Sequence, residues 1–412
     1  MVDAYKILLE RGFIQRYTHH TTEALPSLLA EEGVRCYVGY DGSASSLHVG
    51  HLLSVMALVH LHSKGHCPIV LVGGATTMIG DPSGKRQARK MLEPEEVERN
   101  TKAISRQLAR YFQGREEVIY VNNADWLGRI TLVDFLRQVG SRFTIAEMLT
   151  TEAYKTRLEK GLSFLEFSYQ LFQAYDFWYL YKNYDCKLQI GGDDQWGNIC
   201  AGVDLIRRLE GAQVEGLTLP LLLTASGTKM GKTEQGAIWL DPDRTSPYEF
   251  YQFWRNTHDQ DVERFLKYFT FLPMEEIRKL AQLQGSDIRK AKEVLAFEAT
   301  KITHGEGEAK KAQKAAHSLF YSASEGSEAI PSLSISPQKL SGGFCAIDAF
   351  ILAGLCKSRG EVRRKAKEGG LYLNGKKLTD PFYALQREDF PSGEMLLRFG
   401  KKKYFRLLLE EN

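Results

Sequence analysis

The chain has 412 residues, which at about 150 residues per domain is enough for two or three domains. Its composition is ordinary, with 43% hydrophobic and 25% charged residues, and this excludes a disordered chain, a collagen-like fibre and a long coiled coil. The net charge of +3 does not by itself indicate a nucleic-acid-binding protein.

The six cysteines are scattered and form no C-x-x-C pair, which argues against a disulfide framework or a structural zinc site. The first residues show no basic stretch followed by an apolar one, and no apolar run approaches the roughly 18 residues of a membrane span. We therefore expect a soluble, cytoplasmic protein with no structural metal and no membrane partner.

The first half of the chain predicts an α/β fold with a parallel sheet. After a helical stretch over residues 1–34, residues 35–40 form a short apolar segment that is typical of a buried strand. A helix with apolar residues at three- and four-residue steps then leads to a second strand at 68–74. Two strands joined by one helix form a β-α-β unit with a right-handed crossover. Further strands are expected at 118–121 and 187–190.

The second half of the chain predicts helices first and a small α+β unit last. The pattern is helical from about residue 246 to 321, and residues 322–343 are rich in Ser, Gly and Pro, which is typical of a linker. We therefore expect a Rossmann-like domain, a helical domain, a linker and an α+β domain, over residues 1–240, 241–325, 326–344 and 345–412.

The first polar cluster is an H-x-G-H motif, in which Gly50 lies between His48 and His51 at the start of the helix after the first strand. The spacing puts both imidazoles on one face, at the helix end where backbone N–H groups and the dipole favour anions. Hydroxyl groups such as that of Ser43 add donors for phosphate oxygens, and Gly50 leaves room for a flat group. The alternatives are a capped helix with two surface histidines and an H-x-x-H metal pair.

Two loops carry cations on the ligand side of the predicted sheet. The first contains Lys85 and Arg89, and it is not a Walker A loop because Ile79 stands where that motif requires glycine. The second carries Lys229 and Lys232, which can act as a movable clamp on a leaving pyrophosphate. Taken on its own, each loop is better explained as a solvated surface loop.

A further cluster lies on a predicted helix that is rich in aromatic residues. Tyr169, Gln173 and Asp176 recur at spacings of four and three, so they share one stripe of this helix. Polar groups on such a stripe either satisfy one another in a core, which is the commoner outcome, or bind a ligand. A tight polar turn at 191–198 follows a strand at the same edge of the sheet.

The combination and order of these motifs resemble class I aminoacyl-tRNA synthetases, and the finer pattern resembles bacterial-type tyrosyl-tRNA synthetases over nearly the whole chain. Five ordered segments make the resemblance highly specific: Tyr37 to Asp41, Gly80 to Lys85, Gly191 to Asn198, Lys229 to Thr233 and Thr245 to Trp254. The resemblance implies an ATP-dependent ligase that activates L-tyrosine as tyrosyl-adenylate and transfers it to the 3′ end of tRNA(Tyr). It also implies Mg²⁺ with ATP, a homodimer formed through a helical insertion in the first, catalytic domain, and an anticodon-side position for the helical domain over residues 241–325.

The same resemblance implies roles for individual residues. The phenol of tyrosine would be bound by Tyr37 and Asp176. Its ammonium group would be bound by Tyr169, Gln173 and Asp81, and Gln195 would lie near its carboxylate. ATP would be bound by Gly39, Asp41, Ser43, Gly192, Asp194, Lys232 and Thr233. The residues that act on the phosphates and on the departing pyrophosphate would be His48, His51, Lys85, Arg89, Lys229 and Lys232.

The chain departs from the family pattern at a few positions near the nucleotide. Gly42 and Ser43 stand where the family usually has Pro-Thr, and Val38 replaces a polar residue of some members. Met230 replaces a frequent phenylalanine in the lysine loop. Because Ser43 keeps a hydroxyl group, phosphate contact is still expected, and no charged catalytic group is lost.

Residues 345–412 resemble an S4-type RNA-binding module. Ser358, Arg363 and Arg364 would lie on a helix beside a small sheet and would present cations to an RNA backbone. This stretch has 14 Lys and Arg against nine Asp and Glu, a net charge of +5, whereas the rest of the chain carries −2. The near-neutral total therefore hides a basic tail, for which a solvated surface is the alternative interpretation.

Three other functions fit parts of the pattern. Specificity for tryptophan is disfavoured because Tyr37 and Asp176 suit a hydroxyl group. A small nucleotidyltransferase with the H-x-G-H motif would not need the basic C-terminal module. A synthetase-derived RNA-binding or splicing factor would tolerate loss of the signature histidines and lysines, yet all of them are present.

Overall fold

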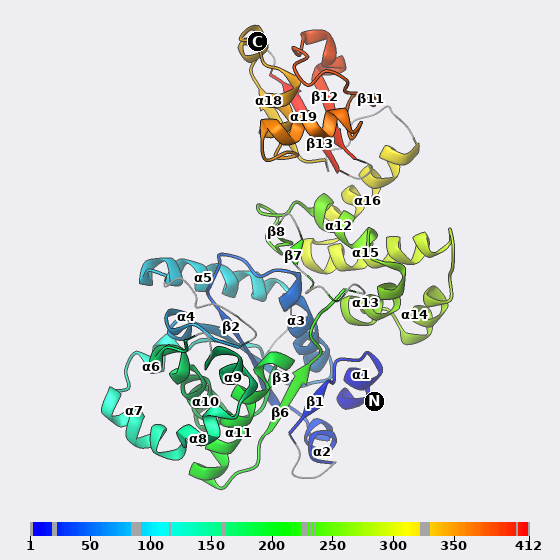
Figure 1. Cartoon of the computed structure of the whole chain (residues 1–412). Helices are drawn as coiled ribbons and strands as arrows, with labels where there is room; N and C mark the ends of the chain where they lie inside the picture. Colours follow the sequence, from blue (N-terminus) through cyan, green and yellow to red (C-terminus); the bar gives the residue numbers. More distant parts are fainter. Residues whose placement is uncertain are drawn as a thin grey trace. The chain divides into compact units, whose positions relative to one another are not determined.

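The computed structural model describes most of the chain (Figure 1). The described residues are 3–18, 23–83, 92–114, 117–158, 161–224, 227, 230, 232–233, 236–321, 330–400 and 403–410. The chain divides into two compact units, Met1–Thr245 with Thr257–Leu295 and Ser246–Asn256 with Ala296–Asn412. This division differs from the boundaries expected from the sequence, because parts of the expected helical domain join each unit.

The first unit is built on a six-stranded sheet. Its strands are β1 (Arg16–Tyr17), β2 (Arg35–Asp41), β3 (Cys67–Gly73), β4 (Ile119–Asn122), β5 (Cys186–Gly192) and β6 (Glu215–Leu219), in the order β1-β6-β5-β2-β3-β4. All neighbours are parallel except β1, which pairs antiparallel with β6. The four strands predicted from apolar runs are confirmed to within two residues, whereas the helical prediction for residues 1–34 misses β1.

The connecting helices cover the sheet, and the order of its strands creates a switch point. Helices α3 (Val49–His62) and α5 (Pro94–Arg110) pack against β3, whereas α10 (Phe164–Tyr184) and α11 (Trp196–Glu210) pack against β5. The chain runs outward from β2 through β3 to β4, then returns to β5 and runs outward the other way to β6. The switch point therefore lies between β2 and β5, which is where such sheets bind ligands.

Burial explains why these segments form these elements. Strand β3 is buried along six of its seven residues, as expected for a parallel strand that is covered on both faces. Helix α3 is equally enclosed, since ten of its 14 residues are buried. Nevertheless, none of the described helices is long and apolar enough to cross a membrane.

Shorter elements complete the helical parts of the chain. In the first unit they are α1 (Ala4–Glu10), α2 (Ala24–Ala30), α4 (Thr76–Ile79), α6 (Ala124–Leu127), α7 (Leu132–Gln138), α8 (Ile145–Leu149), α9 (Glu152–Leu158), α13 (Val262–Phe269) and α14 (Met274–Ala281), with the small strands β7 (Lys232–Thr233) and β8 (Gly236–Ala237). Helices α12 (Pro247–Arg255) and α16 (Glu306–Tyr321) belong to the second unit, and α15 (Ile288–His304) spans the boundary. Residues 246–321 contain no strand, as predicted.

The last part of the chain, residues 330–400 and 403–410, forms a small α+β domain with its own core. Its strands are β9 (Ser332–Ile335), β10 (Leu371–Leu373), β11 (Lys376–Lys377), β12 (Glu394–Phe399) and β13 (Lys403–Leu409), in the order β11-β10-β12-β13-β9. Its helices are α17 (Pro337–Ser341), α18 (Ala346–Leu352) and α19 (Arg359–Lys367). Phe350, Val362 and Leu407 lie in the apolar core between the helices and the sheet.

The expected linker is shorter than its composition indicates. The prediction is wrong for residues 332–341, because β9 and α17 belong to the C-terminal domain. Strand β9 pairs in parallel with β13, and Ile335 is buried in the domain core. Polar residues suit an edge strand that is otherwise exposed, and Pro337 stands at the first position of a helix, where proline is favoured.

Candidate active site

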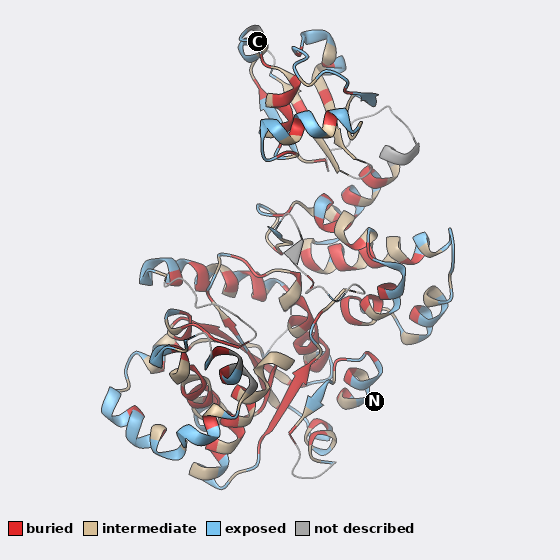
Figure 2. Cartoon of the chain, viewed as in Figure 1, coloured by how far each residue is buried: buried red, intermediate tan, exposed pale blue. Residues whose placement is uncertain are grey.

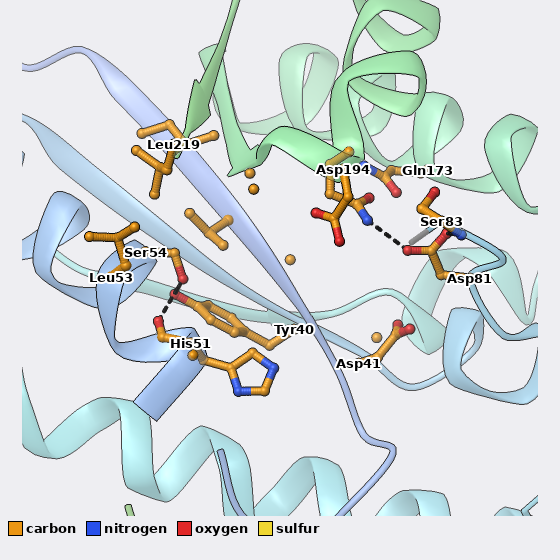
Figure 3. Close-up of a pocket in the computed structure, with 18 of the residues that line it drawn as sticks. Tyr40, Asp41, His51, Leu53, Ser54, Asp81, Ser83, Gln173, Asp194 and Leu219 are labelled. Atoms are coloured by element: carbon orange, nitrogen blue, oxygen red, sulfur yellow. Dashed lines mark hydrogen bonds between the residues drawn. The ribbon is translucent and has the colours of Figure 1, made fainter. Parts of the chain in front are cut away.

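A pocket of about 340 Å³ lies at the switch point of the sheet, beyond the carboxyl ends of β2 and β5. Figure 3 shows His51 and Tyr40 on one side of it and Asp81, Ser83 and Gln173 on the other. The pocket brings together thirteen of the residues predicted to bind tyrosine or ATP: Tyr37, Gly39, Asp41, Ser43, His48, His51, Asp81, Tyr169, Gln173, Asp176, Gly192, Asp194 and Gln195.

Asp176 and Tyr37 form a buried polar end of this pocket, with exposed fractions of only 3% and 2%. The Asp176 carboxylate accepts two hydrogen bonds, from Trp126 Nε1 at 2.7 Å and from Asn123 Nδ2 at 2.9 Å. The Tyr37 hydroxyl has no hydrogen-bond partner among the described residues. Because a buried hydroxyl without a partner is costly, this end of the pocket is suited to a ligand that carries a polar group.

Burial and neighbouring groups set the protonation states of Asp176 and Tyr37. Burial raises the pKa of Asp176 to about 7, and the hydrogen bonds from Asn123 and Trp126 oppose that rise. Burial, and then the nearby Asp176, raise the pKa of Tyr37 well above its usual value. Tyr37 therefore keeps its O–H at neutral pH, and the pair offers a ligand one hydroxyl donor and one carboxylate acceptor.

A chain of hydrogen bonds links Asp176 to Asp41 at the end of β2. Asn123 Nδ2 donates to Thr76 Oγ1 at 2.9 Å, and Thr76 donates to Asp41 Oδ1 at 3.2 Å. The Tyr169 hydroxyl donates to the same Asp41 oxygen at 3.5 Å. A backbone N–H at the start of α4 donates to the Asn123 side-chain oxygen at 2.9 Å. Asn123 is thus oriented so that its amide nitrogen faces Thr76 Oγ1 and the Asp176 carboxylate.

A second network gathers oxygen acceptors around the end of β5. Gln195 Nε2 donates to Asp81 Oδ2 at 2.7 Å. Asn198 Nδ2 donates to the side-chain oxygens of both Gln195 and Gln173 at 3.1 Å. The Asp81 carboxylate is buried, and its other oxygen accepts the Ser83 backbone N–H at 2.8 Å. A buried carboxylate with amide oxygens beside it is suited to a ligand cation.

The two signature histidines are oriented by the backbone of α3. His48 is the N-cap of the helix, and its Nδ1 accepts the Gly50 N–H at 3.0 Å. His51 Nδ1 accepts the His48 N–H at 3.2 Å, and the two rings lie 4.0 Å apart. Because both Nδ1 atoms accept, each imidazole carries a proton on Nε2 and offers an N–H donor there.

Gly50 has a structural role in addition to the one expected. A Cβ at this position would lie 2.7 Å from Cε1 of the His48 ring, so glycine makes room for His48 itself. Gly50 also lines the pocket, so the expectation that it leaves room for a flat group stays a prediction. A structural role is added to it, because a side chain here would push His48 out of its capping position.

The turn before α3 is held by the neighbouring helices. The Gly42 N–H donates to Thr77 Oγ1 at 2.6 Å, and its carbonyl accepts from Asn100 Nδ2 at 2.9 Å. A Cβ at Gly42 would lie 2.8 Å from the Thr101 methyl group. Close packing of α5 thus accounts for glycine at this position, and Ser43 beside it still lines the pocket.

The predicted cationic residues lie wholly or partly outside the described residues. Lys85, Arg89 and Lys229 are among those that the structure does not describe. Lys232 and Thr233 are described only as the backbone of β7. Their contacts with the pocket stay a prediction.

Four residues of the site were not singled out from the sequence: Thr76, Asn123, Trp126 and Asn198. Asn123 follows β4 directly, and Asn198 lies in the first turn of α11, within the polar segment 191–198, so both could have been found from the rule that ligands bind at strand ends. Nothing in the sequence distinguishes Trp126 from a core aromatic residue, because its role depends on where α10 packs.

The residues predicted to bind RNA lie on or beside α19. Ser358 is the N-cap of this helix, and its hydroxyl oxygen accepts the Glu361 N–H at 3.2 Å. Arg363 and Arg364 are exposed. The Arg363 guanidinium lies 5.2 Å from the centroid of the Phe382 ring.

Comparison with known proteins identifies the family. A model of class I tRNA synthetases (W and Y) matches residues 29–321, and one of the tyrosine–tRNA ligase SYY-like C-terminal domain matches residues 323–407. A tyrosine–tRNA ligase of Caldanaerobacter subterraneus subsp. tengcongensis is 49% identical over 98% of this chain and 99% of its own. One of Clostridium botulinum is 48% identical over 100% of both chains. The chain belongs to the class I tyrosyl-tRNA synthetases.

Solved structures of tyrosyl-tRNA synthetases share the fold. A C-terminally truncated mitochondrial enzyme of Aspergillus nidulans aligns with a TM-score of 0.71 and 34% identity, and covers 78% of this chain and 95% of its own. The enzyme of Archaeoglobus fulgidus complexed with L-tyrosine has the same fold, with a TM-score of 0.57 and 19% identity over 76% of this chain and 100% of its own. The predicted family, α/β fold class and enzyme class are confirmed.

Proposed function

We propose that this synthetase joins L-tyrosine to tRNA(Tyr) in two steps. It first forms tyrosyl-adenylate and pyrophosphate from tyrosine and ATP in the pocket between β2 and β5, and then transfers tyrosine to the 3′ end of the tRNA. The observation that carries the choice of amino acid is the buried pair of Tyr37 and Asp176, in which a hydroxyl and a carboxylate lie ready for one ligand group.

A phenol hydroxyl fits this pair. It donates to Asp176, whose carboxylate is oriented by Trp126 and Asn123, and it accepts from Tyr37. Phenylalanine would leave both groups buried without the ligand's hydrogen bonds, at a cost of about 1–3 kcal/mol for each. An indole likewise brings no hydroxyl group, which disfavours tryptophan.

The opposite wall of the pocket suits the charged end of the amino acid. The ammonium group is bound by the Asp81 carboxylate, the Tyr169 hydroxyl and the Gln173 side-chain oxygen. Gln195, which is hydrogen-bonded to Asp81, lies beside the carboxylate of the same substrate. Asn198 acts through the other residues, because its amide nitrogen holds Gln173 and Gln195 together.

The ATP phosphates bind at the start of α3. The helix offers backbone N–H groups and the positive end of its dipole. His48 and His51 add Nε2–H donors, because the Nδ1 atom of each ring accepts a backbone N–H. The Ser43 hydroxyl contributes a further donor. The residues that seat the ribose and adenine at the ends of β2 and β5 are Gly39, Asp41, Gly192 and Asp194.

Adenylation needs no nucleophile from the protein, because the tyrosine carboxylate attacks the α-phosphorus in line and pyrophosphate leaves. Positioning and charge neutralisation are sufficient. Lys85, Arg89, Lys229 and Lys232 supply cations for the pyrophosphate, with Thr233 beside them. Mg²⁺ accompanies ATP and binds through its phosphates, which is the usual mode of this ion with nucleotide substrates.

The C-terminal domain binds the tRNA in an S4-like manner. Its net charge of +5 favours a phosphate backbone, and Arg363 and Arg364 are exposed on one helix, with Ser358 at its start. A cytoplasmic location and a homodimer follow from the family and are part of this proposal.

The dimer is supported by apolar side chains on the first unit. Seven of the sixteen large apolar side chains that are exposed among the described residues fall within residues 132–165: Leu132, Val133, Leu136, Ile145, Leu158, Phe164 and Leu165. Single exposed apolar residues are normal, but such a concentration marks an interaction surface. Figure 2 shows α7 and α8 drawn largely in the colour of exposed residues.

Amino-acid-dependent exchange of pyrophosphate into ATP tests the function. Tyrosine should support exchange, whereas phenylalanine, tryptophan and the other standard amino acids should not. Asp176→Ala should abolish exchange, because the phenol then loses its acceptor. Silence with tyrosine would refute the activity, whereas normal exchange in Asp176→Ala would refute only the assignment of the phenol site.

A further inference from the structure

The C-terminal domain presents a large aromatic ring that its own core does not use. Phe382 has 57% of its surface exposed and is absent from the apolar core of the domain. The neighbouring Tyr383 is 39% exposed. Exposure alone assigns no role to an aromatic ring, but two further features distinguish this one.

The first feature is that the segment carrying the ring is held in place. The carbonyl groups on either side of Phe382 accept backbone N–H groups from the first turn of α18 at 3.0 and 2.9 Å. The Asp380 side chain accepts the Phe382 N–H at 2.9 Å, and the Tyr383 hydroxyl donates to Asp389 Oδ1 at 3.1 Å. A ring on such a segment binds a ligand at little cost in conformational entropy.

The second feature is the positive charge beside the ring. The Arg363 guanidinium lies 5.2 Å from the ring centroid, within the range of a cation–π contact. Helix α19 reads Arg-Gly-Glu-Val-Arg-Arg-Lys-Ala-Lys, and Arg363, Arg364 and Lys367 are exposed on it. Figure 2 shows this exposed part of α19 in pale blue. The ring and Arg363 therefore share one surface, and Lys367, four residues further along α19, lies on the same side of the helix.

We propose that Phe382 and Arg363 form a stacking site for an unpaired base of an RNA, and that Arg364 and Lys367 bind the adjoining phosphates. The inference rests on the proposed RNA-binding function of this domain. It adds that the domain contacts an unpaired nucleotide as well as a phosphate backbone.

The chemistry of the surface favours RNA over an apolar protein partner. Unpaired bases of RNA are bound by stacking on aromatic rings and on guanidinium planes, and every base has a flat face to offer. An apolar protein surface would bury Arg363 and Lys367 without offering them a counter-charge, at a considerable cost in free energy, whereas Arg364 already lies 4.0 Å from Glu368. RNA supplies a phosphate for each of them.

Phe382→Leu tests the proposal, because leucine keeps the apolar bulk and loses the flat ring. We would measure the Kd of the full-length protein for a tRNA(Tyr) transcript by fluorescence anisotropy at several salt concentrations. Phe382→Leu should raise Kd about tenfold and leave the slope of log Kd against log salt unchanged, whereas Phe382→Trp should retain binding. Arg363→Gln should reduce that slope by about one.

Tyr120→Leu is the matched control, since Tyr120 is a 39% exposed aromatic residue of β4 in the first unit and should leave Kd unchanged. Normal affinity in Phe382→Leu, with weakened binding in Arg363→Gln, would overturn the stacking site alone. A changed sedimentation of Phe382→Leu with normal RNA affinity would assign the ring to a protein contact and also overturn it. Full affinity in a double Arg363→Gln, Arg364→Gln variant would refute the RNA-binding function itself, so the two failures are distinguishable.

Discussion

Asp176 is held between its two protonation states by opposing contacts. Burial disfavours the charged carboxylate, whereas the N–H donors of Asn123 and Trp126 favour it, and the resulting pKa is about 7. The folded protein therefore prefers the protonated form more strongly than the unfolded chain does. This preference stabilises the fold below the ordinary pKa of 3.8, and that stabilisation is lost as the pH rises through about 7.

Tyrosine activation should weaken as the pH falls below about 7, because a protonated Asp176 no longer offers two acceptor oxygens to Asn123, Trp126 and the phenol. Asn123→Ala removes a donor that lowers this pKa, so the acid limb of kcat/KM for tyrosine should move up by about one pH unit. Asn183→Ala, which alters an exposed asparagine on α10, should leave the acid limb of the pH profile unchanged. Superimposable profiles for Asn123→Ala and the unmodified protein would contradict this role of Asn123.

At the scale of the elements, the start of α10 determines where its site residues point. The Ser163 hydroxyl and the Glu166 carboxylate form a capping box. Arg157 of α9 donates from Nη2 to both Glu166 oxygens, at 2.7 and 2.9 Å, and the two side chains are only 4% and 10% exposed. Because the first turn of the helix is held in this way, the stripe of Tyr169, Gln173 and Asp176 turns toward the pocket.

Glu166→Ala should lower the free energy of unfolding by about 3–5 kcal/mol, because it removes the carboxylate from a buried ion pair and also from the cap. Urea unfolding followed by circular dichroism measures the change. The control is Glu275→Ala, which breaks an ion pair with Lys279 whose side chains are 77% and 73% exposed. This control should cost less than about 0.5 kcal/mol. Equal unfolding midpoints for the two variants would show that the buried pair contributes nothing beyond an exposed one.

At the scale of the whole molecule, two surfaces account for the proposed partners. One is the apolar surface within residues 132–165, which suits a second copy of the chain. The other is the basic surface of the C-terminal domain, which suits tRNA. The two surfaces belong to different units, so variants can separate their contributions.

Phe164→Asp should weaken the dimer at least about tenfold, because it places a charge where an 80% exposed ring would be covered by the partner. Analytical ultracentrifugation over a range of protein concentrations measures the dissociation constant. Leu9→Asp alters a 53% exposed residue on α1 and should have no effect. A Phe164→Asp protein that sediments as the unmodified one does would place the interface elsewhere.

Removal of the residues after 321 should spare pyrophosphate exchange and reduce transfer to tRNA at least about tenfold, because the basic surface is lost. The cut belongs before β9, since a cut at residue 344 would leave behind a strand that pairs with β13. The Aspergillus nidulans enzyme was solved in a C-terminally truncated form. Normal charging of tRNA by the shortened protein would refute the role of the domain.

Local patterns account for most of what could be predicted. The apolar runs of β2, β3, β4 and β5 are properties of consecutive residues, so their positions were found to within two residues. Strand β1 has only two residues, and β9 is mostly polar, so neither carries a period that a sequence pattern can detect. Both strands exist because a neighbouring strand, β6 or β13, offers free backbone groups at its edge.

The apolar runs were enough to indicate the parallel sheet, and the ordered motifs were enough to indicate the synthetase family. The resemblance to that family then supplied thirteen residues that line the pocket. Tertiary packing decided which contacts those residues make with one another. Asn123 and Asp176 are 53 positions apart, and only the packing of α10 against the end of β4 brings them to 2.9 Å. Gly50 likewise acquired its role from the position of one imidazole ring. Protonation and orientation depend on such contacts between distant residues, and these belong to the fold rather than to any local pattern.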